Sequence, residues 1–357
     1  MRRCFYYPCT MNGAMRIRMI MQASLVLVMT LVLVGASFTN AQDQFLKVKV
    51  RMGDVSLNKL PFVIAYEEGI YKKNGLEVDQ LFTRDAVEIV RRSGVYVPEE
   101  FILKGKGTDL PISIGGASPM MVALTTRAGA EDPVVLASTD QMIRWRIISH
   151  SNIANVEQLK GKRLGYSGYG AVTHFAAISF AKTMGWDPNH DLSLMSDALN
   201  VESLQKGYTD AFVASELHAT MAVAAGFKEL VDLSKYNMPN AGSSVQANRA
   251  WLKTNQETAR RFIKSTVEAI ALLKKDKKAA FRSLAKWYNM KDPKLQEYLY
   301  REVEAMPQKP YPPYDGIKRA MEIYDSHEMR KYRPDHFYND SFVRQLDESG
   351  YVDSLYK

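Results

Sequence analysis

Cysteine is almost absent from this chain of 357 residues, and the two that occur, Cys4 and Cys9, both lie within the first 41 residues. Residues 42–357 therefore form no disulfide and offer no thiolate nucleophile and no cysteine ligand for a metal or cluster. A chain of this length can be stable without disulfides because its hydrophobic core is large enough.

Metal-binding histidine patterns and concentrated positive charge are also lacking. No two of the six histidines stand at a spacing typical of metal ligands: His150, His174, His190, His218, His327 and His336. The formal net charge is +8, but residues 1–41 hold four arginines and no acid, which leaves 8 − 4 = +4 for the rest. Without a dense stripe of basic and aromatic residues, the sequence predicts no nucleic-acid partner.

One long apolar run occurs, and it lies near the N-terminus. Arg16 and Arg18 precede it, it reads "ASLVLVMTLVLVGA" from Ala23 to Ala36, and small residues follow up to Ala41. This order is typical of a secretory signal peptide, and the run is shorter than a membrane-spanning helix needs. We expect residues 1–41 to be removed near Ala41 and the protein to be periplasmic, with a membrane anchor or a buried helix as the alternative. Met1 and Met15 both remain candidate start residues.

Low-complexity tracts and fixed-period repeats are absent too, and strand and helix patterns alternate instead. They predict strands at residues 45–55, 76–83, 110–114 and 133–139, with a helix that begins at Pro61. A second unit begins near Arg146, with strands at 162–165 and 192–198 and another that ends near Ser215. This alternation indicates parallel α/β sheets. After Asn240 the pattern is helical, with one apolar stripe made of Phe262, Thr266, Ala269 and Leu273.

Two loops share one construction, in which a strand, glycines with hydroxyl residues, and a helix follow one another. They are "GGASP" at 115–119 and "GYSGYGAVTH" at 165–174. In open α/β sheets, ligands bind beyond the carboxyl ends of the strands, where helix N-termini offer free N–H groups. Glycines let the backbone approach a ligand closely. The two loops are therefore expected to face each other across a ligand cleft.

Ser167, in the second loop, has several possible roles. A nucleophile elbow requires G-x-S-x-G, but Tyr169 occupies the place of the last glycine and no HGGG-type motif occurs. The loop lacks the Lys-Ser/Thr pair of a phosphate-binding P-loop and the spacing of a dinucleotide fingerprint. The remaining alternatives are a ligand-holding loop and a tight turn with a capping serine.

Taken in order, several segments resemble the periplasmic substrate-binding proteins of the nitrate, sulfonate and thiamine-precursor group. These segments include "SLNKLPFVIAYEEGIYKKNGLEV", "VEQLKGKRLGYSGYG" and "MGWDPNHDLSLM", and the resemblance covers about residues 46–345. It implies an α/β fold of the type II periplasmic binding protein class, with two lobes that each contain a mostly parallel sheet flanked by helices. Lobe 1 would comprise residues 42–140 and 241–357, with the C-terminal helices packed on it, and lobe 2 residues 141–240.

The resemblance further implies a function and a set of site residues. The protein would be a monomer without cofactor or catalytic residue that captures a small ligand by hinge bending and delivers it to a membrane ABC permease. Ligand contacts in the family come from loops that match three groups of residues here: Ser56, Leu57 and Asn58; Gly116, Ala117 and Ser118; and Ser167, Gly168, Tyr169, Gly170 and Thr173.

Glu216 and Trp145 complete the expected site. Glu216 follows a strand end where many relatives have proline, and a buried carboxylate there would favour an amine or hydroxyl donor over a sulfonate or nitrate. An ordinary helix N-terminal acid is the alternative. Trp145 and Tyr169 would stack on the ligand or belong to the core, and Arg144 or Arg146 would pair with a ligand carboxylate or be solvated.

Two other functions remain open from the sequence. Fungal pyrimidine-precursor synthases share the fold but carry a cysteine-rich motif, which residues 42–357 lack. A sensor subunit that presents its ligand to a membrane receptor would have the same sequence features as a transport protein. A segment from Val90 to Pro111 is longer than usual for the family and is expected at the mouth of the cleft.

Overall fold

The computed structural model describes residues 1, 45–105, 110–127, 129 and 131–357. Apart from Met1, the expected signal peptide lies outside the described residues. No helix in these ranges is both long and apolar enough to cross a membrane.

The first sheet has the strand order β2-β1-β3-β10-β4. Its strands are β1 (Leu46–Met52), β2 (Leu76–Phe82), β3 (Ile112–Gly116), β4 (Pro133–Ser138) and β10 (Ser243–Asn248). In β1, Val48, Val50 and Met52 are buried at every second position, as expected for a strand with one face on the core. Strands β1 to β3 pair in parallel, and β10 lies antiparallel between β3 and β4. Four of the five strands therefore share one direction.

The second sheet has the order β7-β6-β8-β5-β9. Its strands are β5 (Arg146–Ser149), β6 (Arg163–Gly165), β7 (Ser193–Met195), β8 (Ala211–Ala214) and β9 (Lys228–Asp232). Here β5 is the antiparallel strand, between β8 and β9, while β6 pairs in parallel with β7 and β8. Both sheets are thus mostly parallel, with one reversed strand each.

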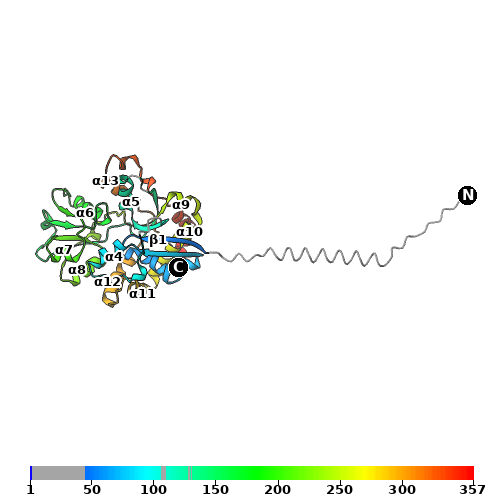
Figure 1. The fold of residues 1–357 in the computed structure, drawn as a ribbon, viewed down its shortest axis with the longest axis horizontal. Coiled ribbons are helices and arrows are strands. Elements are labelled where there is room, and N and C mark those ends of the chain that lie inside the picture. The colour runs from blue at the N-terminus through cyan, green and yellow to red at the C-terminus, as the bar shows by residue number, and fades with distance from the viewer. Residues whose placement is uncertain (2–44, 106–109, 128, 130) are drawn as a thin grey trace. The chain divides into compact units, whose positions relative to one another are not determined.

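Helices cover both sheets (Figure 1): α2 (Leu60–Glu67), α3 (Ile70–Lys73), α4 (Arg84–Arg91), α5 (Ala117–Thr126), α6 (Val172–Thr183), α7 (Val201–Gln205), α8 (Glu216–Ala224), α9 (Arg249–Thr254), α10 (Gln256–Lys275), α11 (Lys277–Trp287), α12 (Pro293–Glu304), α13 (Tyr314–Ile323), α14 (Ser341–Glu348) and α15 (Tyr351–Ser354). Short 3-10 turns lie at Leu57–Lys59, Glu99–Phe101, Glu157–Leu159, Leu233–Tyr236, Met329–Lys331 and Pro334–His336. Figure 1 shows α6, α7 and α8 on one side of the molecule and α9 and α10 on the other.

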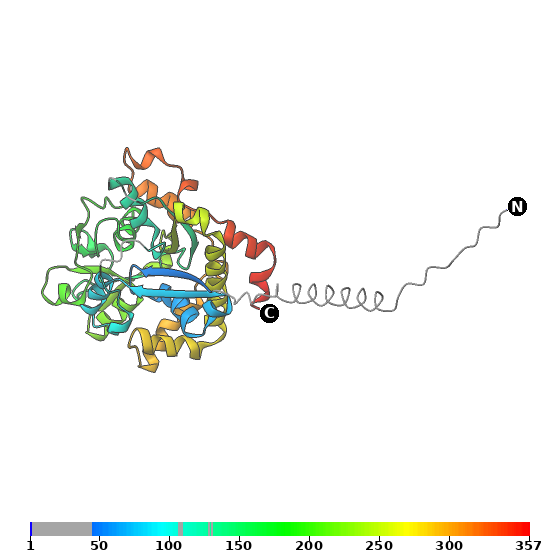
Figure 2. The ribbon, with the colours of Figure 1, turned by 45° about the vertical axis from the view of Figure 1, so that its right-hand side comes forward.

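The C-terminal helices pack mainly against the first sheet. Helix α10 contacts α2, α3, β1 and β2, and Figure 2 shows it beside the blue strands. Its predicted apolar stripe is confirmed, because all four residues are fully buried. Helix α12 also reaches α8, and α13 contacts α5 and α6. Helices α12 and α13 therefore each contact a helix that packs beside the second sheet.

The chain crosses between the two sheets twice, and the crossings lie side by side. Residues 139–145 lead from β4 to β5, and residues 237–242 lead back to β10. The Asn240 N–H donates to the Gln141 carbonyl at 2.9 Å, and the Ile143 N–H donates to the Met238 carbonyl at 2.9 Å. We call this pair of segments the crossing pair.

Helix α13 packs against the crossing pair so closely that Gly316 has no room for a side chain. A Cβ at this position would lie 2.2 Å from the Asn240 carbonyl oxygen and 2.6 Å from the Ala241 nitrogen. Because both neighbours are backbone atoms, Gly316→Ala should lower the free energy of unfolding by about 1 to 3 kcal/mol. Urea denaturation measures this, with Gly168→Ala as the control, since its Cβ meets nothing within 4 Å. Equal stabilities for the two variants would contradict the packing.

Candidate functional site

A cleft of about 1060 Å³ opens between loops of the two sheets, beside the crossing pair. Its lining comes from the first sheet (Asp54, Ser56, Asn58, Gly115, Gly116, Ser243 and Gln246), from the second (Ser167, Gly168, Tyr169, Thr173, Ser215 and His218), and from the crossing pair (Asp140 and Trp145). Both ends of the long segment contribute, since Val90, Leu110 and Pro111 also line the cleft.

The structure brings eight of the thirteen expected site residues to the cleft: Ser56, Asn58, Gly116, Trp145, Ser167, Gly168, Tyr169 and Thr173. The other five, Leu57, Ala117, Ser118, Gly170 and Glu216, lie behind this surface. Leu57, Ala117 and Ser118 are fully buried, and Glu216 is 5% exposed.

The N-terminus of α5 does not offer free N–H groups, contrary to what the loop pattern suggested. The amides of Ala117 and Ser118 both donate to the Ala241 carbonyl, at 3.0 and 3.1 Å. The Ser118 hydroxyl donates to the Gly170 carbonyl at 3.3 Å, which joins the two glycine loops directly. The "GGASP" loop therefore holds the crossing pair and the second loop in place.

The second loop is shaped by an interaction between its two hydroxyl residues. The Ser167 N–H donates to the Thr173 hydroxyl at 3.0 Å, and the two hydroxyl oxygens are 2.7 Å apart. Gly170 has a φ of 77°, a conformation that favours glycine. No histidine contacts Ser167 among the described residues; His174 bonds instead to the Tyr324 hydroxyl at 3.1 Å. Ser167 thus lacks the base that a nucleophile requires.

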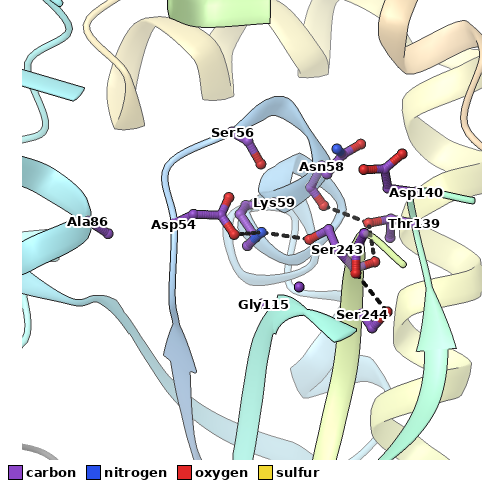
Figure 3. A network of polar contacts seen from close by, with 12 residues as sticks. Asp54, Ser56, Asn58, Lys59, Ala86, Gly115, Thr139, Asp140, Ser243 and Ser244 are labelled. Atoms are coloured by element: carbon purple, nitrogen blue, oxygen red, sulfur yellow. Dashed lines mark hydrogen bonds and ion pairs between the residues drawn. The ribbon is translucent and has the colours of Figure 1, made fainter. Parts of the chain in front are cut away.

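A network of polar contacts forms the floor of the cleft on the first-sheet side (Figure 3). The Lys59 ammonium is fully buried and donates to the Asp54 carboxylate and the Ser243 hydroxyl, each at 2.6 Å. The Thr139 hydroxyl donates to the Asn58 carbonyl at 2.9 Å. The positive charge of Lys59 is therefore neutralised within the network and does not face the cleft.

Asp140, in the crossing pair, lines the cleft and is 2% exposed. The Asn240 amide donates to its Oδ2 atom at 2.8 Å, and no Lys or Arg among the described residues lies at ion-pair distance. Burial raises the pKa of Asp140 to about 6, against the opposing effects of Arg144, Asn240 and Lys59. The carboxyl is therefore still ionised at neutral pH.

Glu216 begins α8 and has a buried Oε2 atom without a hydrogen-bond partner in the described structure. Burial, together with the charges of Glu302 and Asp140, raises its pKa to about 8. Arg144 is not free to pair with it or with a ligand, because its guanidinium contacts Glu302 at 3.2 Å. Arg146 is likewise held by Asp232 at 3.0 Å and Glu302 at 3.4 Å. Arg144 therefore links the crossing pair to α12, and Arg146 links the start of β5 to the same helix.

Ser215 and His218 form a hydroxyl–imidazole pair in the cleft, with 2.8 Å between Oγ and Nδ1. Burial lowers the pKa of His218 to about 4, so the ring is neutral at pH 7. Its Nε2 atom is buried without a partner in the described structure. A catalytic pair needs a third group that orients the base, and no other described residue forms a hydrogen bond with this ring.

Both candidate aromatic residues line the cleft, but their exposure differs. Trp145 is 7% exposed and packs in the core around the second sheet, whereas Tyr169 is 68% exposed at the tip of its loop. Tyr169 can therefore cover a ligand, and Trp145 forms part of the wall.

Sequence reasoning missed the floor of this site. Four residues of the site were not anticipated, and no local motif connects them: Lys59 ends a 3-10 turn, Asp140 lies in the crossing pair, His218 in α8 and Ser243 in β10. Ser243 lies in β10, whose sequence "SSVQAN" lacks the apolar alternation that identifies a strand. The one available signal was that Asp140 follows directly on the strand predicted at 133–139.

Comparison with known proteins adds a family and a fold. The family model described as NMT1/THI5 like matches residues 56–280. No curated protein sequence matches the chain significantly.

Solved structures resemble the chain over most of its length. The periplasmic aliphatic sulphonate-binding protein SsuA from Escherichia coli has a TM-score of 0.59 at 17% identity, covering 82% of this chain and 98% of that one. The periplasmic nitrate-binding protein NrtA from Synechocystis PCC 6803 has a TM-score of 0.67 at 14% identity, covering 87% and 91%. The desulfurization enzyme DSZB has a TM-score of 0.55 at 15% identity, covering 84% and 99%. The fold is therefore that of the periplasmic binding proteins, and it also occurs in an enzyme.

Proposed function

Because this chain belongs to the NMT1/THI5-like family, we propose that it is an exported solute-binding protein that captures a small organic ligand and delivers it to an ABC-type importer. The observation that carries the proposal is the cleft of about 1060 Å³ between the loops of the two sheets. Its size is that of a small-molecule site. Its lining combines polar groups with a few apolar and aromatic side chains, the composition expected for specific binding.

We propose that the molecule divides into two lobes at the crossing pair, residues 42–140 with 241–357 and residues 141–240. Two adjacent backbone connections between two sheets are suited to hinge bending, because only a few residues need to change conformation. Closure would bring the Ser167 loop toward Ser56 and Asn58 and exclude water from the ligand. The closed monomer would then dock on the permease.

The alternative of a pyrimidine-precursor synthase or a hydrolase is less well supported. Ser167 contacts no base, and the Ser215–His218 pair has no orienting third group among the described residues. We therefore propose that the protein binds its ligand without changing it. Product formation from any ligand that the protein binds would refute this.

Thermal unfolding with a ligand panel tests the proposed function. A ligand at one hundred times its dissociation constant should stabilise the protein by about 2.7 kcal/mol, which raises the melting temperature by a few degrees. Native mass spectrometry of the same sample identifies a ligand that copurifies. Failure to find any bound or stabilising small molecule would count against a solute-binding role. Export is checked by N-terminal sequencing of the periplasmic protein, with Gln42 expected as the first residue.

Ser167→Ala should weaken ligand binding and leave the fold intact. The variant loses one hydroxyl that faces the cleft, together with its contact to Thr173. We expect affinity to fall by about fivefold to tenfold, the effect of one hydrogen bond. Isothermal titration measures affinity, and the melting temperature without ligand serves as the control. Unchanged affinity would mean that this loop does not contact the ligand.

A further inference from the structure

The charged residues that line the cleft differ sharply in burial. Asp85, Arg127, Glu131 and Asp197 are exposed, and Arg51 is half-buried and donates to the Ser113 hydroxyl. Asp54 is paired with Lys59. Asp140 is the buried member of this set, with no cation paired to it among the described residues. A ligand that reaches the floor of the cleft therefore meets a carboxylate whose charge is not balanced by a direct contact.

Asp140 and its partner Asn240 each have a side-chain oxygen that accepts no hydrogen bond from the described residues. Asn240 donates to Oδ2, whereas Oδ1 accepts no hydrogen bond from the described residues. The Asn240 Oδ1 atom is itself buried without a partner in that part of the chain. Across the cleft, the buried Nε2 atom of His218 is also unpartnered, and it can accept when the Nδ1–H group donates to Ser215. The unpaired oxygen of a carboxylate that lines the cleft favours a ligand with an N–H donor.

We propose, on the basis of the solute-binding function above, that the ligand is an organic cation whose ammonium or amidinium group binds Asp140. A sulfonate, nitrate or carboxylate would bring a second negative charge to a buried carboxylate, which is strongly unfavourable. Lys59 forms no ion pair with Asp140, because its ammonium donates to Asp54 and Ser243. Since Asp140 lies in the crossing pair, the cation would also bind at the proposed hinge.

The proposal predicts a charge preference that shape-matched probes can measure. Butylamine, benzylamine and benzamidine should raise the melting temperature, whereas butanesulfonate, benzenesulfonate and benzoate should not. Stabilisation by the anions would overturn the proposal and leave the solute-binding function intact. If neither the amines nor the anions bind and native mass spectrometry shows no copurified small molecule, the cation proposal and the solute-binding function are both refuted. A copurified anion or neutral solute would overturn the cation proposal alone.

Asp140→Asn should weaken binding of the best cation by about 30-fold or more, since one partner of a buried charge pair is lost. The asparagine can still accept from Asn240, so the crossing pair should remain intact. Asp79→Asn is the matched control, because Asp79 is exposed and does not line the cleft. Equal affinity for the two variants would refute the role of Asp140. If Asp140 had only a structural role, the unliganded Asp140→Asn variant would melt at a lower temperature than the parent. We expect the opposite: at pH values above 7 the unliganded variant should melt at a higher temperature than the parent.

The pH dependence provides an independent readout of the same contact. The carboxyl must be ionised to bind a cation, and its pKa is raised by burial to about 6. Arg144 and Lys59 lower the pKa and Glu302 raises it, while the charge of Asp140 in turn raises the pKa of Glu216. Affinity for the amine should therefore fall by about tenfold per pH unit below 6 in the parent protein. In the Asp140→Asn variant, the affinity for the amine should not change with pH over the same range. An equally steep fall in that variant would assign the titration to another group.

Discussion

Glu216→Gln is expected to make the protein more stable at high pH. The carboxyl has a pKa near 8 in the folded protein, raised by burial from its ordinary value of 4.5. A carboxyl with a raised pKa binds a proton more tightly in the folded state. The parent therefore loses stability as the pH rises from about 4.5 to about 8, and the loss is complete above that.

Glutamine has the shape of protonated glutamate and does not titrate, so the variant avoids this loss. At pH 9 we expect it to exceed the parent by about 3 to 5 kcal/mol, and at pH 4 the two should be nearly equal. Denaturant unfolding between pH 4 and 9 measures the difference. Glu202→Gln is the control, because Glu202 also lies in a first helical turn but is ionised with a pKa lowered by Lys206. A parallel pH profile for parent and Glu216→Gln would show that the carboxyl is not buried.

Trp287→Ala should produce the largest loss of stability. Trp287 is 1% exposed at the end of α11, and its ring stacks on Phe101 with the centroids 3.7 Å apart. Phe82 and Tyr66 pack against its edges, and its indole N–H donates to Glu67 at 2.8 Å. Truncation removes all of these contacts and leaves a cavity, at a cost of about 3 to 5 kcal/mol.

Guanidinium unfolding followed by circular dichroism measures this loss, because the substitution also removes a fluorophore. Trp251→Ala is the matched control, since Trp251 on α9 is only partly buried and should cost less. Trp287→Phe should fall between the parent and Trp287→Ala, because the ring is kept and the hydrogen bond is lost. A loss below about 1 kcal/mol for Trp287→Ala would mean that the long segment does not pack as described.

The stacking of Phe101 on Trp287 also shows where the segment from Val90 to Pro111 lies. The sequence predicted this segment at the mouth of the cleft. Its ends do line the cleft, but Val95, Val97 and Phe101 in its middle are buried in the core around the first sheet. The insertion therefore extends the core and contributes to the cleft at the same time. Length alone could not distinguish these two roles.

The family and the fold were predictable from the sequence because they depend on local patterns in a fixed order. Strands such as β1 and β2 alternate apolar and polar residues, and helix α10 carries its apolar residues on one face. Such patterns arise from the 2.0 and 3.6 residue periods of strand and helix. The strand β10 escaped this reasoning, because it is covered on both faces and its small polar residues are buried by neighbouring strands. Burial of that kind is imposed by tertiary contacts.

The candidate site also has parts that the sequence predicts and parts that depend on tertiary contacts. The Ser167 loop was identifiable, because a strand, a glycine-rich turn and a helix follow one another along the chain. The Lys59–Asp54–Ser243 contacts and the Asp140–Asn240 pair join residues up to 184 positions apart, and no local pattern encodes them. The same holds for Ala117 and Ser118, whose amides face the Ala241 carbonyl and not the cleft. The sequence by itself determined which loops border the cleft, because local backbone preference sets them. Only the tertiary structure decided the charge that a ligand meets, because charge balance and burial depend on which distant side chains become neighbours.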